Sequence, residues 1–518
     1  MNFGGMALKQ PRLRFAVKGL TVGIVVGIVV SSFRWLIEHG LDWALHWYQH
    51  FTWPTALGLL GLNLLIGILI AQLLKQEPDI AGSGIPQVEG QLQGELDLSW
   101  WSILWRKFVG GILALSAGLF LGREGPSIQL GAAVGQGLSE WQHDRGSDRR
   151  IMIASGAAAG LAAAFNAPIA GSLFVLEEIY HNFSPLVWLS SLASAIGANF
   201  ISLYIFGERP VLHLVYPKAL PIDAYWHLLL LGVALGLLGK VYQWVLLRLP
   251  DWYALTHIPR RYQGLIPLVA VIPIGFLTPQ LLGGGNQLII QLGQQMPSVL
   301  TLLGIFAIRF VFSMVSYGSG LPGGIFLPIL SLGAIIGAIY AQSMVGLHLL
   351  PAMYAVNFVI FAMAGYFAAI GKAPFTAILL VTEMVGNLKL LMPLAVVALI
   401  AYLVLDGLHG DPIYEALLAK LVHQPARGEM GQMARIEVPI FAGSALEEQQ
   451  VRDIAWPKSA LLIGIIQGEK EVLPHGDSVL QAGQTLVVLT APLDRQRVRR
   501  QIRQLATVTK TPGISRNH

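Results

Sequence analysis

The sequence predicts an all-α, polytopic membrane protein with many broken and re-entrant helices, followed by a small C-terminal α/β domain. Three observations indicate this fold class. Charged residues are scarce, apolar stretches recur up to about residue 405, and many of these stretches are interrupted at Gly and Pro.

Composition separates this chain from soluble proteins. Of its 518 residues, 54% are hydrophobic and only 12% are charged, whereas roughly a quarter of the residues in soluble domains are charged. The mean hydropathy is +0.61. These values exclude a soluble multidomain enzyme, a disordered chain and a nucleic-acid-binding protein. The chain has no Cys, which excludes disulfides, thiolate metal sites and Cys nucleophiles. We expect neither a metal nor a cofactor.

The apolar stretches are the expected membrane helices. They lie at about residues 20–37, 55–75, 107–121, 151–164, 168–180, 185–206, 226–248, 262–282, 298–315, 325–348, 355–371, 373–385 and 388–405. A full span needs about 20 apolar residues, and several of these stretches are shorter. Flanking basic clusters, such as Lys9–Lys18 and Arg145–Arg150, are typical of cytosolic loops.

Glycine and proline break the apolar pattern repeatedly. The breaks are Gly82–Pro86, Gly122–Pro126, Asn166–Pro168, Gly323–Pro328 and Lys372–Pro374. Open backbone at membrane depth is tolerated only where it is buried in protein or lines a watery cavity. Many such breaks are typical of a transporter or a channel, whereas a receptor bundle does not need them.

Two pairs of segments indicate an internal repeat. Asn166–Glu177 aligns with Lys372–Glu383 at an offset of 206, and Pro126–Gly135 aligns with Pro328–Gly337 at an offset of 202. Paired breaks in corresponding positions of two halves point to a central binding site.

Charges return after about Ala426, and the pattern changes to that of a small α/β domain. Ala460–Gln467 and Gln484–Thr490 predict strands, and Leu493–Leu505 predicts a basic terminal helix. We therefore divide the chain into a transmembrane region (1–427, with halves at about 15–215 and 216–427), a cytosolic domain (428–508) and a flexible tail (509–518).

Three of the broken segments are suited to bind an anion. Gly82–Pro86, Gly122–Pro126 and Gly324–Pro328 each place a Pro-started helix N-terminus in the apolar region, and such an end carries partial positive charge and unpaired N–H donors. An ion at the membrane centre costs about 3 kcal/mol or more, whereas one helix terminus contributes at most ~2 kcal/mol. Several ends must therefore converge, with added hydroxyl donors such as Ser83. The alternative is that Gly and Pro serve helix packing and kinks.

Glu124 is the most informative single residue. It lies two residues before Pro126, so its carboxylate is beside a helix N-terminus that would otherwise hold an anion. Ionised, it can occupy that site in place of the anion, and protonated it can leave. This gives a gate that depends on protonation. The alternative is a structural salt bridge with the neighbouring Arg123.

Glu177 and Glu178 end the apolar run that begins at Pro168. Adjacent helical residues point about 100° apart, so the two carboxylates cannot serve one ligand as a pair. We expect one of them to face the interior and the other a neighbouring element or water, unless both are ordinary polar residues at a helix end.

The three Pro-started segments, in this order, resemble the signature segments of the CLC chloride channels and transporters. Gly160–Pro168 and Gly410–Tyr414 are also similar to family segments, and the resemblance covers about residues 15–425. It implies a homodimer in a lipid membrane. Each subunit would have its own anion pathway and consist of two halves of inverted topology.

The resemblance also implies which residues hold the anion. Ser83 and Tyr414 would offer hydroxyls to a central chloride ion, and the backbone N–H groups of Ile325 and Phe326 would complete its site. Serine at position 83 resembles the chloride-selective branch of the family. Gln87 departs from the glutamate often found there, which leaves the anion ligands untouched but alters the local field.

Two glutamates carry the implied proton chemistry. Glu124 matches the external gating glutamate of the family. Glu178 matches the internal glutamate that passes protons in many antiporter members, where channels commonly carry an apolar residue.

The C-terminal domain resembles a different family. Glu471–Leu486 is similar to the C-terminal half of the regulatory domains of potassium-uptake systems, the TrkA-C or RCK C-terminal domain. This match covers about residues 430–508. It implies a cytosolic regulatory domain with a small ligand that the sequence does not identify.

The leading interpretation is exchange of chloride for protons by a non-enzymatic antiporter in a prokaryotic plasma membrane. A passive chloride channel of the same fold, gated by voltage or pH, is the alternative, and the sequence separates the two only through Glu178.

Two other classes are less favoured. A cation transporter is suggested by the potassium-type tail, but the chain has no Thr-Val-Gly-Tyr-Gly filter and offers helix N-termini where a cation would need carbonyl oxygens. A membrane enzyme is disfavoured because there is no His-Glu-x-x-His motif. Ser155-Gly156 lies in an Ala/Gly stretch that is typical of close helix packing.

Overall fold

The computed structural model describes residues 11–507 except for 181–182, 209, 213, 215–217, 423–433, 442, 468–469 and 492–493. The chain forms two compact units. The helical unit consists of Met1–Leu92, Leu98–Phe183 and Val187–Lys420, and the C-terminal unit consists of Gln93–Asp97, Ser184–Leu186 and Leu421–His518.

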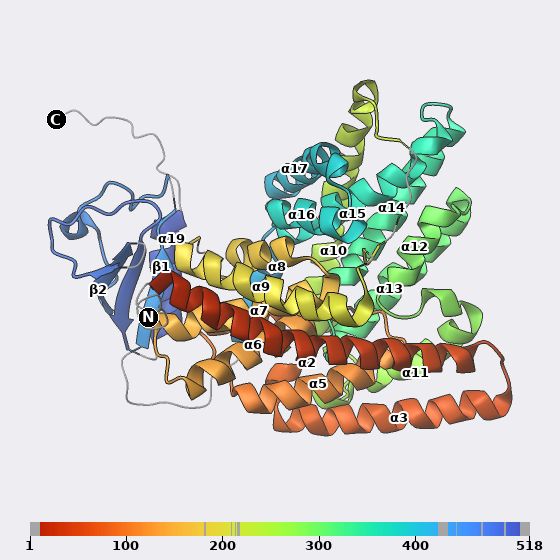
Figure 1. The fold of residues 1–518 in the computed structure, drawn as a ribbon, viewed down its shortest axis with the longest axis horizontal. Coiled ribbons are helices and arrows are strands. Elements are labelled where there is room, and N and C mark those ends of the chain that lie inside the picture. The colour runs from red at the N-terminus through yellow and green to blue at the C-terminus, as the bar shows by residue number, and fades with distance from the viewer. Residues whose placement is uncertain are drawn as a thin grey trace, which may run out of the picture. The chain divides into compact units, whose positions relative to one another are not determined.

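The helical unit follows the repeat that the sequence predicts, with two series of helices in the same order (Figure 1). The first series is α2 (Pro11–Tyr48), α3 (Trp53–Gln76), α4 (Ile85–Leu92), α5 (Trp100–Ser116), α6 (Glu124–Trp141), α7 (Ser147–Phe165), α8 (Pro168–Phe174) and α9 (Pro185–Phe206). The second series is α10 (Trp226–Ala254), α11 (Leu265–Leu277), α12 (Asn286–Gln294), α13 (Val299–Gly318), α14 (Phe326–Gly346), α15 (Ala355–Gly371), α16 (Pro374–Val385) and α17 (Leu391–Gly407), after which comes α18 (Ile413–Val422).

Short helical turns join several of these helices. A π-helical turn, η2 (Val175–Ile179), continues α8, and the remaining turns of the helical unit are 3-10 segments. These are η1 (Pro78–Ile80), η3 (Ile222–Ala224), η4 (Arg260–Tyr262), η5 (Pro279–Leu281), η6 (Ala352–Tyr354) and η7 (Leu388–Leu390).

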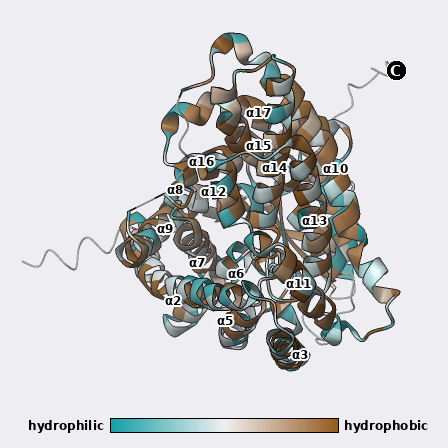
Figure 2. Ribbon diagram, turned by 90° about the vertical axis from the view of Figure 1, so that its right-hand side faces the viewer, coloured by the Kyte–Doolittle hydropathy of each residue, from teal (hydrophilic) through white to brown (hydrophobic). Residues whose placement is uncertain are grey.

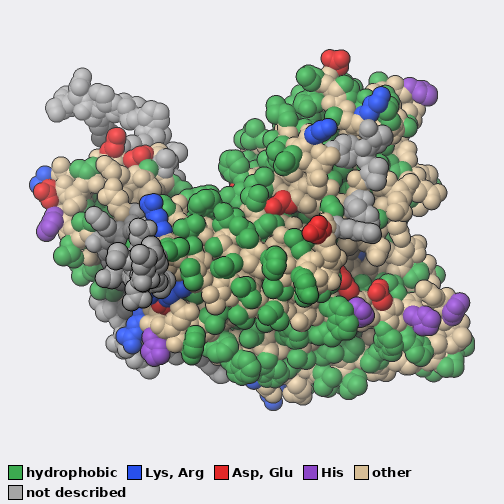
Figure 3. All heavy atoms as spheres, in the orientation of Figure 1, with side chains coloured by type: hydrophobic (Ala, Val, Ile, Leu, Met, Phe, Trp, Pro, Cys, Tyr) green, Lys and Arg blue, Asp and Glu red, His purple; other side chains and the backbone are tan. Residues whose placement is uncertain are grey.

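The helical unit has the properties of a polytopic membrane protein. Within the described residues, eight helical segments are long and apolar enough to cross a membrane. Figure 2 shows that long helices such as α3 and α13 are mainly hydrophobic, and Figure 3 shows hydrophobic side chains over the face formed by α2, α3 and α9. The expected stretches differ from the helices at some ends. The stretch 20–37 lies within the much longer α2, and the stretch 107–121 extends past the end of α5 at Ser116.

The two halves run in opposite directions, as the inverted topology requires. The Glu177 carboxylate, at the end of α8, accepts hydrogen bonds from the backbone N–H groups of Phe375 and Thr376 at 3.2 and 2.8 Å. In return, Glu383 near the end of α16 accepts hydrogen bonds from the first turn of α8, at 3.1 and 2.8 Å. The end of each helix therefore lies at the start of its repeat mate. Equivalent helices that run antiparallel establish an inverted repeat.

Small residues allow the central helices to pack closely. α6 packs on α7 and α14 packs on α15, which are equivalent pairs in the two halves. A methyl group added at Gly156 would overlap the carbonyl oxygen of Gly131, and one added at Gly131 would overlap the carbonyl oxygen of Gly156. The Ser155 hydroxyl binds the hydroxyl of Ser190 at 2.8 Å. The Ala/Gly stretch thus serves helix packing, as expected.

The C-terminal unit contains a four-stranded antiparallel sheet in the order β1-β4-β2-β3. Its elements are β1 (Ala434–Pro439), the 3-10 segment η8 (Val451–Asp453), β2 (Ala460–Gln467), β3 (Lys470–Val472), β4 (Thr485–Thr490) and α19 (Arg495–Thr507). Its core combines strand residues such as Ile436 and Leu486 with Val498 and Ile502 of α19.

The α/β prediction for this unit is confirmed. β2 has the expected bounds and β4 begins one residue later than expected. β1 and the short β3 were not predicted. The terminal helix begins at Arg495 and ends at Thr507, while the expected start at Leu493 lies outside the described residues.

The close packing of α6 on α7 predicts a large effect of one methyl group. We expect Gly156→Ala to destabilise the helical unit by about 1–3 kcal/mol, because the added methyl must displace the backbone of α6. The measurement is the thermal unfolding midpoint of the purified protein in detergent. Gly304→Ala in α13 is the control, since no atom lies within 4 Å of a methyl group at that position. Equal midpoints for the two variants would contradict the packing described.

Candidate functional site

The three glycine-rich segments that precede α4, α6 and α14 meet in the interior of the helical unit. Gly122 and Gly324 exchange two backbone hydrogen bonds of 2.7 Å each. The Gly82 N–H donates to the carbonyl oxygen of Gly320 at 3.3 Å, and the Gly323 N–H donates to the carbonyl oxygen of Gly82 at 3.0 Å. These bonds hold the starts of three helices together, which is the convergence that an anion site in the membrane requires.

Glycine is required where these segments approach one another. Gly82 and Gly84 have φ angles of 63° and 90°, a backbone conformation that side chains disfavour. Gly125, in the first turn of α6, lies so close to Ser83 that an added methyl group would overlap the Ser83 hydroxyl. The segments before α4 and α6 therefore touch directly.

Two buried hydroxyls without a partner lie in this region. Ser83 is 2% exposed and Tyr414 is fully buried, and within the described residues neither hydroxyl has a hydrogen-bond partner. Leaving a buried hydroxyl unpaired costs about 1–3 kcal/mol, and both hydroxyls can donate a hydrogen bond to a ligand that enters this region. The ring of Phe174 contacts the rings of both Tyr414 and Phe326, with centroid distances of 6.1 and 5.7 Å.

The start of α14 adds backbone donors to the same region. Ile325 is the N-cap residue and Phe326 is the first residue of the helix, and both are buried. The first N–H groups of a helix have no acceptor within that helix. They are therefore available to a ligand, as the resemblance implies for both residues.

Glu124 is the first residue of α6 and is fully buried. Its carboxylate lies against Gly122 and near the backbone N–H of Leu327. Among the described residues, neither carboxylate oxygen has a hydrogen bond of good geometry. The neighbouring Arg123 forms its ion pair with Glu38 at 2.6 Å. Within the described residues, the ion pair of Arg123 is thus with Glu38, and no ion pair within 4 Å joins Arg123 to Glu124.

The two adjacent acids after α8, Glu177 and Glu178, have different surroundings. Glu177 binds the start of α16, whereas Glu178 is 3% exposed and faces the interior. This confirms the prediction that the two carboxylates point to different surroundings. Both lie in the π-helical turn η2, and such turns are frequent at functional sites.

Tyr414 is near both buried acids of the site. It interacts electrostatically with Glu124 and with Glu178. Glu89, on α4, is also fully buried and is close enough to interact with Glu178. The sequence analysis did not identify Glu89, although an acidic residue within one turn of the Gly82–Pro86 segment was a signal for it.

Two buried cations shape the loops of the site, and the sequence analysis missed both. The Lys107 ammonium group donates to the carbonyl oxygens of Ile80 and Gly82 at 2.8 and 2.7 Å. The Arg309 guanidinium donates to the carbonyl oxygens of Leu281 and Gly283 at 2.9 and 2.8 Å. The two residues are 202 positions apart, which is the offset of the repeat. A cation within an apolar stretch was the signal that could have identified them.

Gln87, the position that departs from the family pattern, lies in the first turn of α4 and is 3% exposed. Its side-chain amide donates to the carbonyl oxygen of Ala81 at 2.9 Å. The residue thus stabilises the loop before α4 rather than contributing a charge.

Comparison with known protein families identifies the family of each part of the chain. Residues 62–406 match the family described as voltage gated chloride channel. The chain belongs to this family. Residues 435–503 match the TrkA-C domain, and both resemblances found in the sequence are confirmed.

Several relatives of this chain are named as transporters. The H(+)/Cl(-) exchange transporter ClcA of Klebsiella pneumoniae is 34% identical over 436 residues, which are 82% of this chain and 90% of the relative. The crystal structure of a slow cyanobacterial Cl-/H+ antiporter matches with a TM-score of 0.75 and 32% identity, over 80% of this chain and 99% of that chain. A eukaryotic CLC transporter, 19% identical with a TM-score of 0.67 over 79% of this chain and 74% of its own, shares the fold.

The carboxylates of Glu177 and Glu383, each bound to the first turn of the other's helix, predict an effect on protein stability that is independent of the candidate site. Glu383→Ala leaves the backbone N–H groups of Ile169 and Ala170 without their acceptor, so we expect a loss of about 1–3 kcal/mol. The thermal unfolding midpoint in detergent measures it. Asp223→Asn, which neutralises an exposed carboxylate, is expected to leave the midpoint unchanged. A Glu383→Ala midpoint within error of the wild type would refute the capping role.

Proposed function

We propose that this chain is a secondary active transporter that exchanges chloride for protons across the membrane. The observation that carries this proposal is the fully buried Glu124, placed at a helix start where three such starts meet. The similarity to relatives named H(+)/Cl(-) exchange transporter, and to the structure of a Cl-/H+ antiporter, supports exchange over a passive channel.

Chloride binds at the meeting point of the three helix starts. The Ser83 and Tyr414 hydroxyls and the backbone N–H groups of Ile325 and Phe326 donate hydrogen bonds to it. The unpaired state of both buried hydroxyls supports this assignment. N–H and O–H donors stabilise an anion without trapping it, whereas a direct contact with a buried cation would bind it too tightly for rapid release.

Glu124 couples the two ions because its carboxylate and chloride compete for the same donors. When ionised, Glu124 occupies the outer end of the anion path. When protonated, it loses its attraction to the helix N-termini and leaves, so chloride can enter. Each chloride that moves thus requires a change in the protonation of this one group.

Glu178 transfers protons between the interior of the helical unit and the cytosol. Its burial next to other acids is costly for a residue without a function. Tyr414 interacts electrostatically with both Glu124 and Glu178, and we propose that protons leave the chloride route near this residue. The buried acid at position 178 also disfavours the alternative of a voltage- or pH-gated channel.

The setting of the transporter follows from the same resemblance. We propose a homodimer in the plasma membrane of a prokaryote, with residues 1–427 in the lipid and the TrkA-C-like domain, 428–508, in the cytosol. Light scattering of the detergent complex tests for twice the 56.1 kDa chain mass. A regulatory small ligand is proposed for the C-terminal domain.

Reconstitution into liposomes tests the exchange. An imposed chloride gradient should drive protons against their own gradient, recorded with a pH electrode and a chloride electrode in parallel. For Glu124→Ala we expect chloride flux to continue without proton movement, because the group that links the ions is gone. If the wild-type protein conducts chloride without moving protons uphill, the exchange proposal is refuted and the protein is a passive chloride channel. Continued proton pumping by Glu124→Ala would refute the role of this carboxylate.

Glu178→Gln tests the internal proton step separately. We expect proton flux to fall to background while chloride flux persists, because the amide cannot release a proton. Glu177→Gln is the matched control, since it neutralises the adjacent carboxylate, which caps α16 and lies outside the proposed route. The control should retain the wild-type ratio of chloride to protons. Loss of coupling in both variants, or in neither, would contradict the assignment to Glu178.

A further inference from the structure

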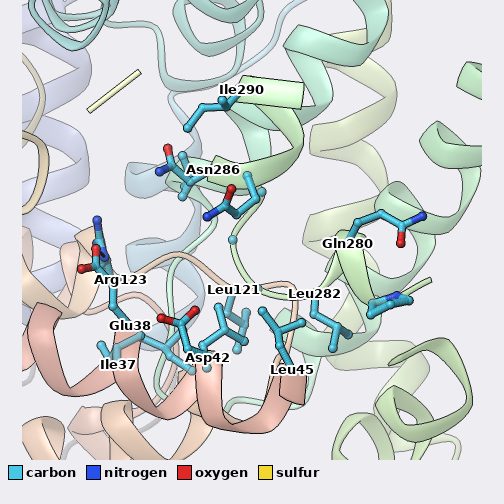
Figure 4. Close-up of a pocket in the computed structure, with 18 of the residues that line it drawn as sticks. Ile37, Glu38, Asp42, Leu45, Leu121, Arg123, Gln280, Leu282, Asn286 and Ile290 are labelled. Carbon is cyan, nitrogen blue, oxygen red and sulfur yellow. Dashed lines mark hydrogen bonds and ion pairs between the residues drawn. The ribbon is translucent and has the colours of Figure 1, made fainter. Parts of the chain in front are cut away.

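A hollow of about 630 Å³ lies beside the start of α6 (Figure 4). Three parts of the chain form its walls. They are α2, the stretch from the end of α5 to the start of α6, and the segment from η5 to the start of α12. The ionisable side chains that line it are Glu38, Asp42 and Arg123. The basic residues at the start of α2, Arg12 to Lys18, indicate that this end of α2 is cytosolic. Glu38 and Asp42, toward the other end of the same helix, therefore lie on the outer side.

Glu38 binds two arginines at the edge of this hollow. One oxygen of its carboxylate accepts hydrogen bonds from the Arg34 guanidinium at 3.0 Å and from the Arg123 guanidinium at 2.6 Å. The Glu38 side chain is 38% exposed, whereas those of Arg34 and Arg123 are only 11% and 12% exposed. The carboxylate is therefore the water-facing member of the cluster, and the two cations are buried behind it.

Both arginines are held next to the gate. Arg123 directly precedes Glu124 in the chain. Arg34 packs over the ring of Phe206 at 3.9 Å and also donates to the side-chain oxygen of Asn166 at 3.5 Å. Each guanidinium interacts electrostatically with Glu124. The cluster of Arg34, Glu38 and Arg123 carries a net charge of +1, and the single carboxylate keeps that charge from being +2.

We propose that Glu38 is a positioning residue for the exchange: it holds Arg123 against α2 and offsets the positive charge beside Glu124, and it thereby sets the external acidity at which exchange begins. This inference rests on the gating role proposed for Glu124. Within the described residues, the other charged groups around Glu38 are the two arginines and, in the same hollow and on the same helix, Asp42. The residues of the η5–α12 segment that line the hollow are all uncharged, among them Gln280, Leu282 and Asn286.

The sign of the effect follows from the charges. Without the Glu38 carboxylate, two buried guanidinium groups remain beside Glu124, and they favour its ionised form. A higher external proton concentration is then needed to protonate Glu124 and free the anion path. Removing one of the cations has the opposite effect, because the ionised form of Glu124 loses an attractive neighbour.

The experiment measures exchange in liposomes as a function of external pH. For Glu38→Gln we expect the half-maximal rate to move to a more acidic pH by about half a unit or more, with the ratio of chloride to protons unchanged. Asp42→Asn is the matched control, because it removes the same charge from the same hollow, one helical turn away, without a bond to Arg123. Its shift should be less than half as large. Glu38→Asp should restore the wild-type profile at least in part.

Two further variants keep the test decisive if Glu38→Gln does not fold. Arg34→Gln should move the midpoint to a less acidic pH. In a Glu124→Ala background, where exchange is replaced by uncoupled chloride flux, Arg34→Gln should have no effect on the pH profile of that flux, and neither should Glu38→Gln where it folds. Three outcomes would overturn the inference. The pH midpoint could shift equally in Glu38→Gln and Asp42→Asn, it could shift in the same direction in Arg34→Gln as in Glu38→Gln, or the effects could persist in the Glu124→Ala background. Retained coupling in Glu124→Ala would instead overturn the proposed function on which it rests.

Discussion

The structure depends on one electrostatic constraint, which is that a negative charge in the middle of a membrane must be surrounded by donors that the protein itself supplies. No single helix end can do this, because its contribution of at most ~2 kcal/mol is smaller than the cost of the charge. The chain meets this constraint by joining three helix starts through hydrogen bonds between glycines, chiefly the pair of Gly122 and Gly324. Glycine is needed at position 122 because an added methyl group would overlap the Glu124 carboxylate.

The inverted repeat explains how helix starts from both halves reach the same place. Because α8 and α16 are antiparallel and each ends at the start of the other, equivalent segments enter the interior from opposite sides. The starts of α6 and α14 then meet across the centre. The same relation gives each half a buried cation that organises one loop, Lys107 for the loop before α4 and Arg309 for the loop before α12. The same arrangement, a buried cation bound to loop carbonyl groups, thus occurs in both halves, although only the loop before α4 contains a serine, Ser83.

Much of this arrangement could be predicted from the sequence, and the limits of the prediction have physical causes. Composition and broken apolar stretches indicated the membrane fold, and the Pro-started segments located Ser83 and Glu124 because their chemistry is local in sequence. The partner of Arg123 could not be predicted, since Glu38 lies 85 residues earlier and only the packing of α2 on α6 brings them together. The short strand β3 also escaped prediction, because its three residues are held by pairing with β2 rather than by any pattern of their own.

The two buried cations have a consequence for cation exclusion. Lys107 and Arg309 are both fully buried, and within the described residues the structure assigns neither of them an ion pair, so carbonyl and hydroxyl oxygens are their acceptors. Oxygen dipoles disperse a positive charge but do not cancel it. In the part of the chain that the structure describes, each half of the repeat therefore places one basic side chain without an acidic partner in the interior of the helical unit. For the anion pathway proposed above, these two groups act in the same direction as the helix starts, because a positive charge favours an anion over sodium or potassium.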